Sequence, residues 1–335
     1  MIKLTFLIPI SFCMFLLLPQ TSFAAATADP LANAKTQAIL NYLANLPNLS
    51  SNRVVSGQFA YTISDVNNIN AQTGHYPGLI GTDVANNPIS NANIIAWSNA
   101  NGLVTAVHHW NNPYGGDSWT TMTDSQFSAL TTNSTFLGYL NSVASIFQTY
   151  QNNNVTVLYR PFHEMNGGWF WWGAKTPSVF KSMWQFVFNY MTTTKGLHNI
   201  LWVYGPNSGS GITDYYPGSQ YTDIVGMDIY GGVDVTDTSD YNALLTLNKP
   251  FGLTEYGPGP SSGMSPTDWS HFIVSLKTNM PRTAFWMNWG NTFAMAVNPG
   301  TSTILADPWV VTRDEISISG SDITAPAAPT GLRVR

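Results

Sequence analysis

The chain has only three glutamate residues in 335, and two of them lie where a charged group is least expected. Glu164 lies in an aromatic run, YRPFHEMNGGWFWWG (159–173), and Glu255 lies in an apolar run, FGLTEYGP (251–258). A carboxyl group among indole rings is poorly solvated, which raises its pKa and lets it keep a proton near neutral pH. One such acid beside an ionised carboxylate suits cleavage of a glycosidic bond, because the acid protonates the leaving oxygen while its partner attacks the anomeric carbon.

A second interpretation of the same glutamates is a buried ion pair. Arg160 is the only arginine near Glu164 in the sequence, and buried ion pairs perturb carboxylates without any catalysis. The third glutamate, Glu315, lies beside Arg313 and Asp314 and is interpreted as surface decoration.

Two familiar hydrolase motifs have weak matches in this chain, one complete but in an unsuitable context and one incomplete. Residues 259–263 (GPSSG) match G-x-S-x-G, but the surrounding prolines indicate a loop rather than the sharp turn that an esterase serine needs. His163-Glu164 begins like H-E-x-x-H, yet the fifth position is Gly167, so a zinc-protease helix is not expected. Asp117 and Asp124 could contribute to a surface Ca²⁺ site, which nothing else in the sequence supports. We therefore expect neither a metal nor a cofactor.

The glutamates need a scaffold that brings strand ends together, and eight β-rich runs alternate with helical patterns along the chain. Such alternation predicts a parallel sheet with crossover helices, and eight repeats in about 300 residues favour a (β/α)8 barrel over an open, doubly wound sheet. Polar residues at the carboxyl ends of the runs support the barrel, since that face of a barrel carries the chemistry. The expected strands are 54–58, 79–83, 103–109, 155–160, 200–204, 224–228, 251–255 and 283–289. Helices are expected over 124–150, capped by Asp124, and from Pro177 to about Thr194.

Aromatic residues make up 13% of the chain and charged residues only 9%. Indole and phenol rings offer flat apolar faces on which a pyranose can stack. Six tryptophans fall on predicted loops or strand ends, with core packing as the alternative for each: Trp110, Trp119, Trp169, Trp171, Trp172 and Trp289. Three others are assigned to the core: Trp97, Trp184 and Trp202.

Three runs resemble glycoside hydrolase family 26, and the first is most similar to its endo-β-1,4-mannanases: 159–173, 226–231 (GMDIYG) and 253–257 (LTEYG). The resemblance extends from about Ser56 to Trp289. It implies a (β/α)8 barrel, hydrolysis with retention, Glu164 as acid/base and Glu255 as nucleophile. The run after the eighth strand differs, because many mannanases have Trp-Arg where this chain has WMNW (286–289).

Further residues are expected to contact the substrate. His109 matches a family histidine beside the cleaved sugar, and the resemblance extends to His163, Trp169, Asp228 and Tyr230. Contacts are also expected from Trp110, Arg160, Trp172 and Trp289.

The expected activity is an endo-β-1,4-mannanase acting on mannan, glucomannan or galactomannan. A β-1,3-xylanase or mixed-linkage β-glucanase would use the same carboxylates. A non-catalytic carbohydrate-binding protein on a decayed barrel is the alternative of another class, and the two strand-end glutamates argue against it.

The ends of the chain differ from the middle. Residues 1–26 have one basic residue, an apolar run of about 15 residues and a stretch of small residues, which is typical of a secretory signal peptide. Residues 27–322 form the expected catalytic domain. Residues 323–335 are interpreted as a linker and the start of a possible truncated module like fibronectin type III. The one cysteine, Cys13, lies in the expected signal peptide.

Charge and hydropathy limit the partners. The net charge is −5, and the 13 lysines and arginines are scattered, so no basic surface for nucleic acid is expected. Beyond residue 26 no segment is apolar enough to cross a membrane. We expect a secreted, extracellular monomer whose partner is a β-mannan polysaccharide or oligosaccharide.

Overall fold

Parallel strands close into a barrel in the computed structural model, which describes residues 25–48, 52–86, 89–259 and 266–318. Each strand from β2 to β8 pairs in parallel with the next. β9 pairs with both β8 and β2, which closes the ring. The predicted (β/α)8 barrel is confirmed. Its strands are β1 (Val54–Val55), β2 (Gly57–Phe59), β3 (Leu79–Asp83), β4 (Leu103–Val107), β5 (Val157–Tyr159), β6 (Ile200–Tyr204), β7 (Ile224–Tyr230), β8 (Phe251–Gly257) and β9 (Thr283–Asn288), with a short β10 (Val310–Val311) beside β1.

All eight predicted strands are present, the first one divided at Ser56 into β1 and β2. The strands are buried on both faces, which explains why several of their sequences are continuously apolar. Trp97, Trp184 and Trp202 are buried, as predicted for core residues.

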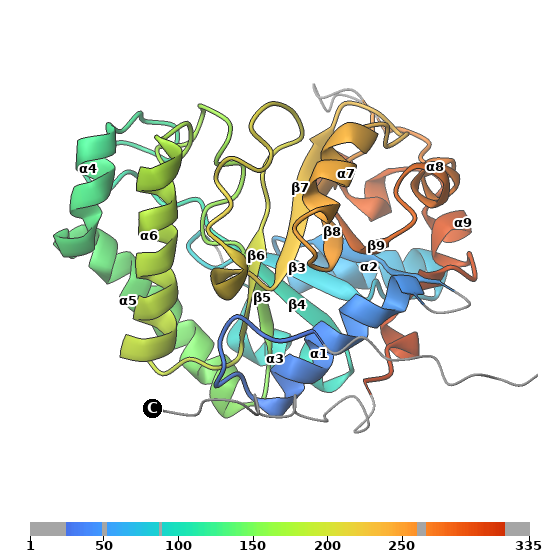
Figure 1. The fold of residues 1–335 in the computed structure, drawn as a ribbon. Helices are drawn as coiled ribbons and strands as arrows, with labels where there is room; N and C mark the ends of the chain where they lie inside the picture. The colour runs from blue at the N-terminus through green and yellow to red at the C-terminus, as the bar shows by residue number, and fades with distance from the viewer. Residues whose placement is uncertain (1–24, 49–51, 87–88, 260–265, 319–335) are drawn as a thin grey trace, which may run out of the picture.

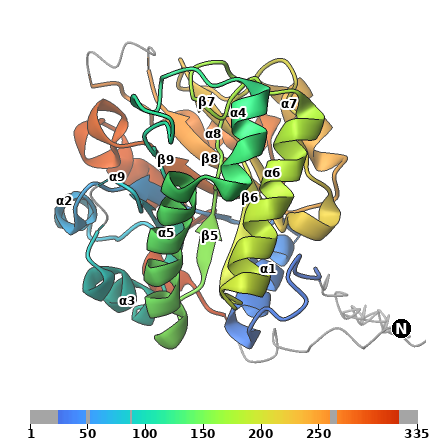
Figure 2. The same ribbon diagram turned by 90° about the vertical axis from the view of Figure 1, so that its left-hand side faces the viewer.

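Helices surround the barrel (Figure 1). Figure 2 shows α5 and α6 in front of β5 and β6. The helices are α1 (Ala34–Asn45), α2 (Ile63–Thr73), α3 (Asn91–Asn99), α4 (Asp124–Ser128), α5 (Ser134–Asn152), α6 (Pro177–Asn189), α7 (Thr238–Leu245), α8 (Phe272–Asn279) and α9 (Thr301–Leu305). Within the described ranges, no helix is both long and apolar enough to span a bilayer.

Two predicted helices differ from the structure. The helix expected over 124–150 is interrupted by a 3₁₀ turn, Ala129–Thr132, and begins again after Asn133, whose side chain accepts a hydrogen bond from the Phe136 N–H. The helix from Pro177 is α-helical to Asn189 and ends in a π-turn, Tyr190–Thr194. The apolar period continues through both irregularities, so the sequence pattern did not reveal them.

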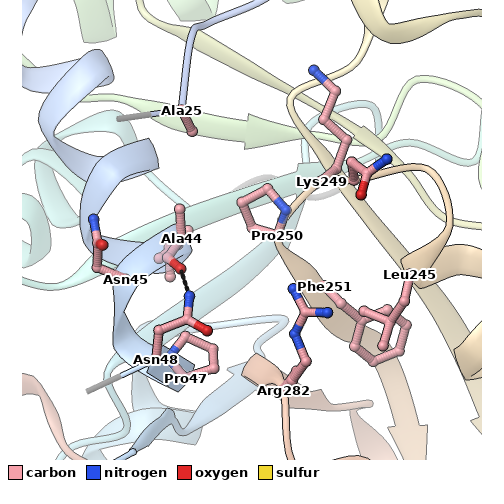
Figure 3. A pocket seen from close by; sticks show the side chains of 12 residues that line it. Ala25, Ala44, Asn45, Pro47, Asn48, Leu245, Lys249, Pro250, Phe251 and Arg282 are labelled. Atoms are coloured by element: carbon pink, nitrogen blue, oxygen red, sulfur yellow. Dashed lines mark hydrogen bonds between the residues drawn. The ribbon is translucent and has the colours of Figure 1, made fainter. Parts of the chain in front are cut away.

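The amino ends of the strands form the face of the barrel opposite to the carboxyl ends, where the glutamates are expected. A cavity of about 250 Å³ lies there between the end of α1 and the residues that lead into β8 and β9 (Figure 3). Its polar lining consists of the asparagines Asn45, Asn48 and Asn248 with Lys249 and Arg282, and none of its lining residues is a carboxylate or a histidine. The lining of this cavity therefore lacks the groups that the predicted chemistry needs.

Several predictions fall outside the described residues. They concern positions 1–24 of the expected signal peptide, including Cys13, the 323–335 linker, and most of the GPSSG motif (259–263), of which only Gly259 is described.

Candidate active site

Glu164 follows β5 on a turn with an unusual backbone conformation. Its φ is 51°, in the left-handed region that non-glycine residues rarely adopt, and its N–H donates to the Gly205 carbonyl at 2.8 Å. Strained backbone of this kind persists where the surrounding structure fixes it, often at functional sites. One carboxylate oxygen accepts a hydrogen bond from the Trp169 indole N–H at 2.7 Å. The turn thus fixes where the carboxyl group lies.

The environment of Glu164 favours its protonated form. Burial, followed by the nearby charge of Glu255, raises the pKa of Glu164 to about 8, against the opposing effects of Trp169 and Arg160. A carboxylic acid with such a pKa holds its proton at neutral pH and can donate it.

Glu255 lies near the end of β8 and is held through both oxygens. Arg160 donates from Nη2 to Oε1 at 2.6 Å, and the Tyr230 hydroxyl, at the end of β7, donates to Oε2 at 2.6 Å. Hydrogen bonds to a charged carboxylate favour that charged form. Glu255 is therefore held through both oxygens and paired with a cation, in contrast to Glu164.

Arg160 also bonds to a second carboxylate beneath the site. Its Nη1 lies 3.0 and 3.1 Å from the two oxygens of Asp228, which also accepts the Thr254 hydroxyl at 2.6 Å. Arg160 and Asp228 are fully buried, at 1% and 0% exposed. The ion pair with Arg160, the alternative interpretation of both glutamates, thus forms with Glu255 but not with Glu164, and Arg160 also pairs with Asp228. Arg160 and Asp228 differ from the prediction of substrate contacts, because they lie under the glutamates and position them.

The two candidate catalytic carboxylates are close together. Single oxygens of Glu164, Asp228 and Glu255 all lie within 4.8 Å of one another. Retaining glycosidases have carboxyl groups roughly 5–5.5 Å apart, whereas inverting enzymes leave roughly 6.5–9.5 Å for a water. The separation matches direct attack by one carboxylate. These are also the acidic groups, among the described residues, close enough to share a cation, but Asp228 and Glu255 are already bonded to the Arg160 guanidinium.

A chain of imidazoles lies beside the carboxylates. His109, just past β4, contacts Asp83 through Nδ1 at 2.9 Å and the Nε2 atom of His163 through its own Nε2 at 3.2 Å. Burial and the neighbouring His109 hold the pKa of His163 well below its usual value, so this ring is neutral. The predicted residues His109 and His163 are thus adjacent, and His163 is buried.

The predicted tryptophans divide into two groups. Trp169 is 37% exposed beside Glu164, and Trp289 is half-buried with its ring 5.9 Å from that of His109. Trp110 and Trp172 differ from the prediction, because they are 4% and 0% exposed and lie in the core. Trp172 donates its indole N–H to the His163 carbonyl at 2.7 Å, so it supports the turn that carries Glu164. Trp110 stacks on His108 with ring centres 3.4 Å apart.

The sequence prediction of the site omitted four residues. Asp83 ends β3 and fixes His109, and the strand-end argument that selected His109 would have found it. Phe170 packs against His109 and His163, and Phe59 stacks on Trp289 at 3.9 Å. Tyr61 follows β2 and is 39% exposed at the edge of the site. The two phenylalanines carried no separate signal, because phenylalanine is common in cores.

Known proteins share this sequence and architecture. A model of glycosyl hydrolase family 26 matches residues 28–315. A mannan endo-1,4-beta-mannosidase of Bacillus subtilis (strain 168) is 34% identical, over 89% of this chain and 91% of that protein. Mannan endo-1,4-beta-mannosidase A and B of Caldalkalibacillus mannanilyticus is 37% identical over 89% of this chain, which spans 64% of that longer protein. The solved structure of Bacillus subtilis mannanase man26 superposes with a TM-score of 0.81 at 31% identity, covering 88% of this chain and 97% of the other. The chain therefore belongs to glycosyl hydrolase family 26, a family of retaining glycoside hydrolases.

Proposed function

We propose that this enzyme is an endo-β-1,4-mannanase that hydrolyses mannan, glucomannan or galactomannan with retention. The observation that carries the proposal is a pair of close carboxyl groups in different environments. The pKa of Glu164 is raised to about 8, whereas Glu255 accepts hydrogen bonds from Arg160 and Tyr230. The two sequence relatives described above are both named mannan endo-1,4-beta-mannosidases, which supports mannan as the substrate.

The reaction runs in two displacements. In the first, the Glu164 carboxylic acid gives its proton to the glycosidic oxygen while a Glu255 oxygen attacks the anomeric carbon, so the C–O bond to the leaving sugar breaks and a glycosyl ester forms. In the second, Glu164, now a carboxylate, takes a proton from a water, and that water attacks the anomeric carbon. The ester bond breaks, Glu255 leaves as a carboxylate and Glu164 regains its proton.

Substrate binding is assigned to the exposed groups around these carboxyls. Trp169 and Trp289 offer ring faces for stacking on sugars, and His109 borders the sugar at the cleaved bond. Arg160, His163 and Asp228 act as positioning residues from below.

A reducing-sugar assay on a panel of mannan, β-1,3-xylan and barley β-glucan tests the substrate. We expect release of reducing ends from mannan at the highest rate. NMR of the first product should show the β anomer, since two inversions restore the starting configuration. Preference for xylan or glucan, or early release of the α anomer, would contradict the proposal.

We also propose that the protein is exported and acts as a monomer outside the cell. The signal-like composition of residues 1–26 supports export, as does a polysaccharide substrate too large to enter a cell. N-terminal sequencing of the enzyme from culture medium should find a first residue near 25–27, and size-exclusion chromatography should give the mass of one chain. An uncleaved N-terminus or a larger particle would contradict this.

A further inference from the structure

Tyr61 lies across the barrel from the acid-side turn. Around the ring, β5 carries Glu164 and Trp169 at its end, while β9 and β2 lead to Trp289 and Tyr61. Four strand steps separate β5 from β9 in either direction, so these loops lie on opposite sides of the barrel mouth. Because Glu164 protonates the leaving sugar, the β5 side receives the leaving part of the chain. The β9 and β2 side therefore receives the glycone, the part that becomes bonded to Glu255.

A continuous row of rings leads outward on that glycone side. Trp289 adjoins His109, Phe59 stacks on Trp289 at 3.9 Å, and Tyr61 packs edge-on against Phe59 at 5.3 Å. Phe59 is 1% exposed and Tyr61 is 39% exposed. Tyr61 is thus the last ring of the row, beyond Phe59 and Trp289, and it is exposed to solvent.

The position of Tyr61 is fixed by its surroundings. Its backbone N–H donates to the Asp65 carboxylate at 2.7 Å, at the capped start of α2, and its hydroxyl accepts a hydrogen bond from Asn291 Nδ2 at 3.1 Å. Burial, followed by the charge of Glu255, raises the pKa of Tyr61, so its hydroxyl keeps its proton and can donate it in a hydrogen bond at neutral pH. A ring held in this way binds a ligand without a further loss of side-chain entropy.

Gly290 leaves the space that Tyr61 fills. A Cβ atom built at Gly290 would lie 2.5 Å from Cε2 of the Tyr61 ring, too close for a real contact. The backbone at Gly290 has φ −81° and ψ −170°, which any residue can adopt. The Tyr61 ring, not the backbone, therefore explains the glycine that directly follows Trp289.

We propose that Tyr61, seated on Gly290 and bonded to Asn291, is a specificity-determining residue that binds the second sugar of the glycone. Its exposed ring area suits the C–H face of a pyranose, and its hydroxyl can donate to a sugar oxygen while accepting from Asn291. This inference rests on the proposed mannanase function.

Two chromogenic substrates separate this contact from the chemistry. An aryl β-mannoside fills only the position of the first glycone sugar, whereas an aryl β-mannobioside fills the first and second. Tyr61→Ala should lower kcat/KM for the mannobioside by about tenfold, an effect typical of losing one ring or hydrogen-bond contact, and should leave the mannoside unchanged. Tyr61→Phe keeps the ring and should lower kcat/KM for the mannobioside by a smaller factor.

Tyr114 provides a matched control. It is also an exposed tyrosine, at 46%, on the loop after β4, and its hydroxyl bonds to the Gln126 carbonyl. Tyr114→Ala should leave kcat/KM for both aryl substrates unchanged.

Gly290→Ala tests the seating of the ring. It should displace Tyr61 and reproduce the selective loss on the mannobioside, but it should cost nothing further in a Tyr61→Ala background. Equal loss on both aryl substrates, no loss on either, or a penalty for Gly290→Ala that persists without Tyr61 would overturn the inference. Failure of the unmodified enzyme to cleave mannan would instead overturn the proposed function.

Discussion

At the scale of single residues, Glu164 combines a strained backbone with a perturbed acid. Its left-handed φ of 51° directs the carboxyl group toward Glu255, and burial near that second charge raises its pKa. Below about pH 8 the group keeps the proton that it must donate, and above this pH it is ionised and cannot act as an acid.

The first prediction concerns pH. The kcat/KM for mannan should fall as pH rises through about 8, because the fraction of protonated Glu164 falls there. In Glu164→Ala, acting on an aryl glycoside whose phenol leaves without protonation, this descending limb should be absent. A limb that persists in that variant would assign the pH dependence to another group.

The second prediction separates the two glutamates. Glu164→Ala should lose nearly all cleavage of polysaccharide, by about 10²–10⁴-fold, yet still form the glycosyl-enzyme from an activated aryl glycoside. Azide should then revive turnover and give a β-glycosyl azide. Glu255→Ala should lose the first step on every substrate, and any azide rescue should give the α product. The opposite pattern in the two variants would exchange their roles.

The two carboxylates were predictable from sequence, but the surroundings of the tryptophans were not. Glu164 and Glu255 stand out because glutamate is scarce in this chain and both lie at strand ends. Trp169 and Trp172 are three positions apart in one aromatic run, yet one is 37% exposed and the other fully buried. Composition does not tell a ring that faces a cleft from one that packs beneath it, because both need apolar neighbours.

At the scale of elements, Arg160 connects β5 to β7 and β8. It follows β5 directly and bonds to Asp228 on β7 and Glu255 on β8, both buried. Removing Asp228 leaves Arg160 paired with Glu255 but takes away two charge-assisted hydrogen bonds, and hydrogen bonds to charged groups contribute about 1.5–3 kcal/mol.

The third prediction therefore concerns Asp228→Asn. We expect the free energy of unfolding to fall by about 1.5–3 kcal/mol, measured by denaturant titration, with a loss of activity because Arg160 is no longer held from both sides and Glu255 loses its fixed orientation. Asp234→Asn, which breaks an exposed pair with His271 in the segment after β7, should change stability by less than about 1 kcal/mol. Equal falls in the free energy of unfolding would show that the buried network stabilises the protein no more than the exposed ion pair does.

Strands were easier to predict than helix interruptions, for a physical reason. A strand buried on both faces needs a short apolar run, and several of the eight runs, such as 200–204 (ILWVY), contain little else. The break before α5 depends on one local hydrogen bond, in which the Asn133 side chain accepts from the Phe136 N–H. Because asparagine is common in this chain, an asparagine at position 133 does not by itself indicate the start of a helix.

At the scale of the whole molecule, the described barrel ends near Ile318, which packs partly buried against the core. The fourth prediction is that deleting residues 324–335 leaves activity and Tm nearly unchanged, since their sequence is typical of a linker. Thermal unfolding of the shortened and full-length proteins makes the comparison. A fall of several degrees would mean that the deleted residues stabilise the barrel.

In the proposed reaction Glu255 forms a covalent bond with the sugar. The most direct measurement is mass spectrometry of peptides from enzyme treated with a 2-deoxy-2-fluoro-β-mannosyl fluoride, in which fluorine slows the second displacement and the ester accumulates. We expect one fluoromannosyl group on the peptide that contains Glu255, and no such label in Glu255→Ala. A label on Glu164, or full inactivation without any covalent sugar, would contradict this role of Glu255.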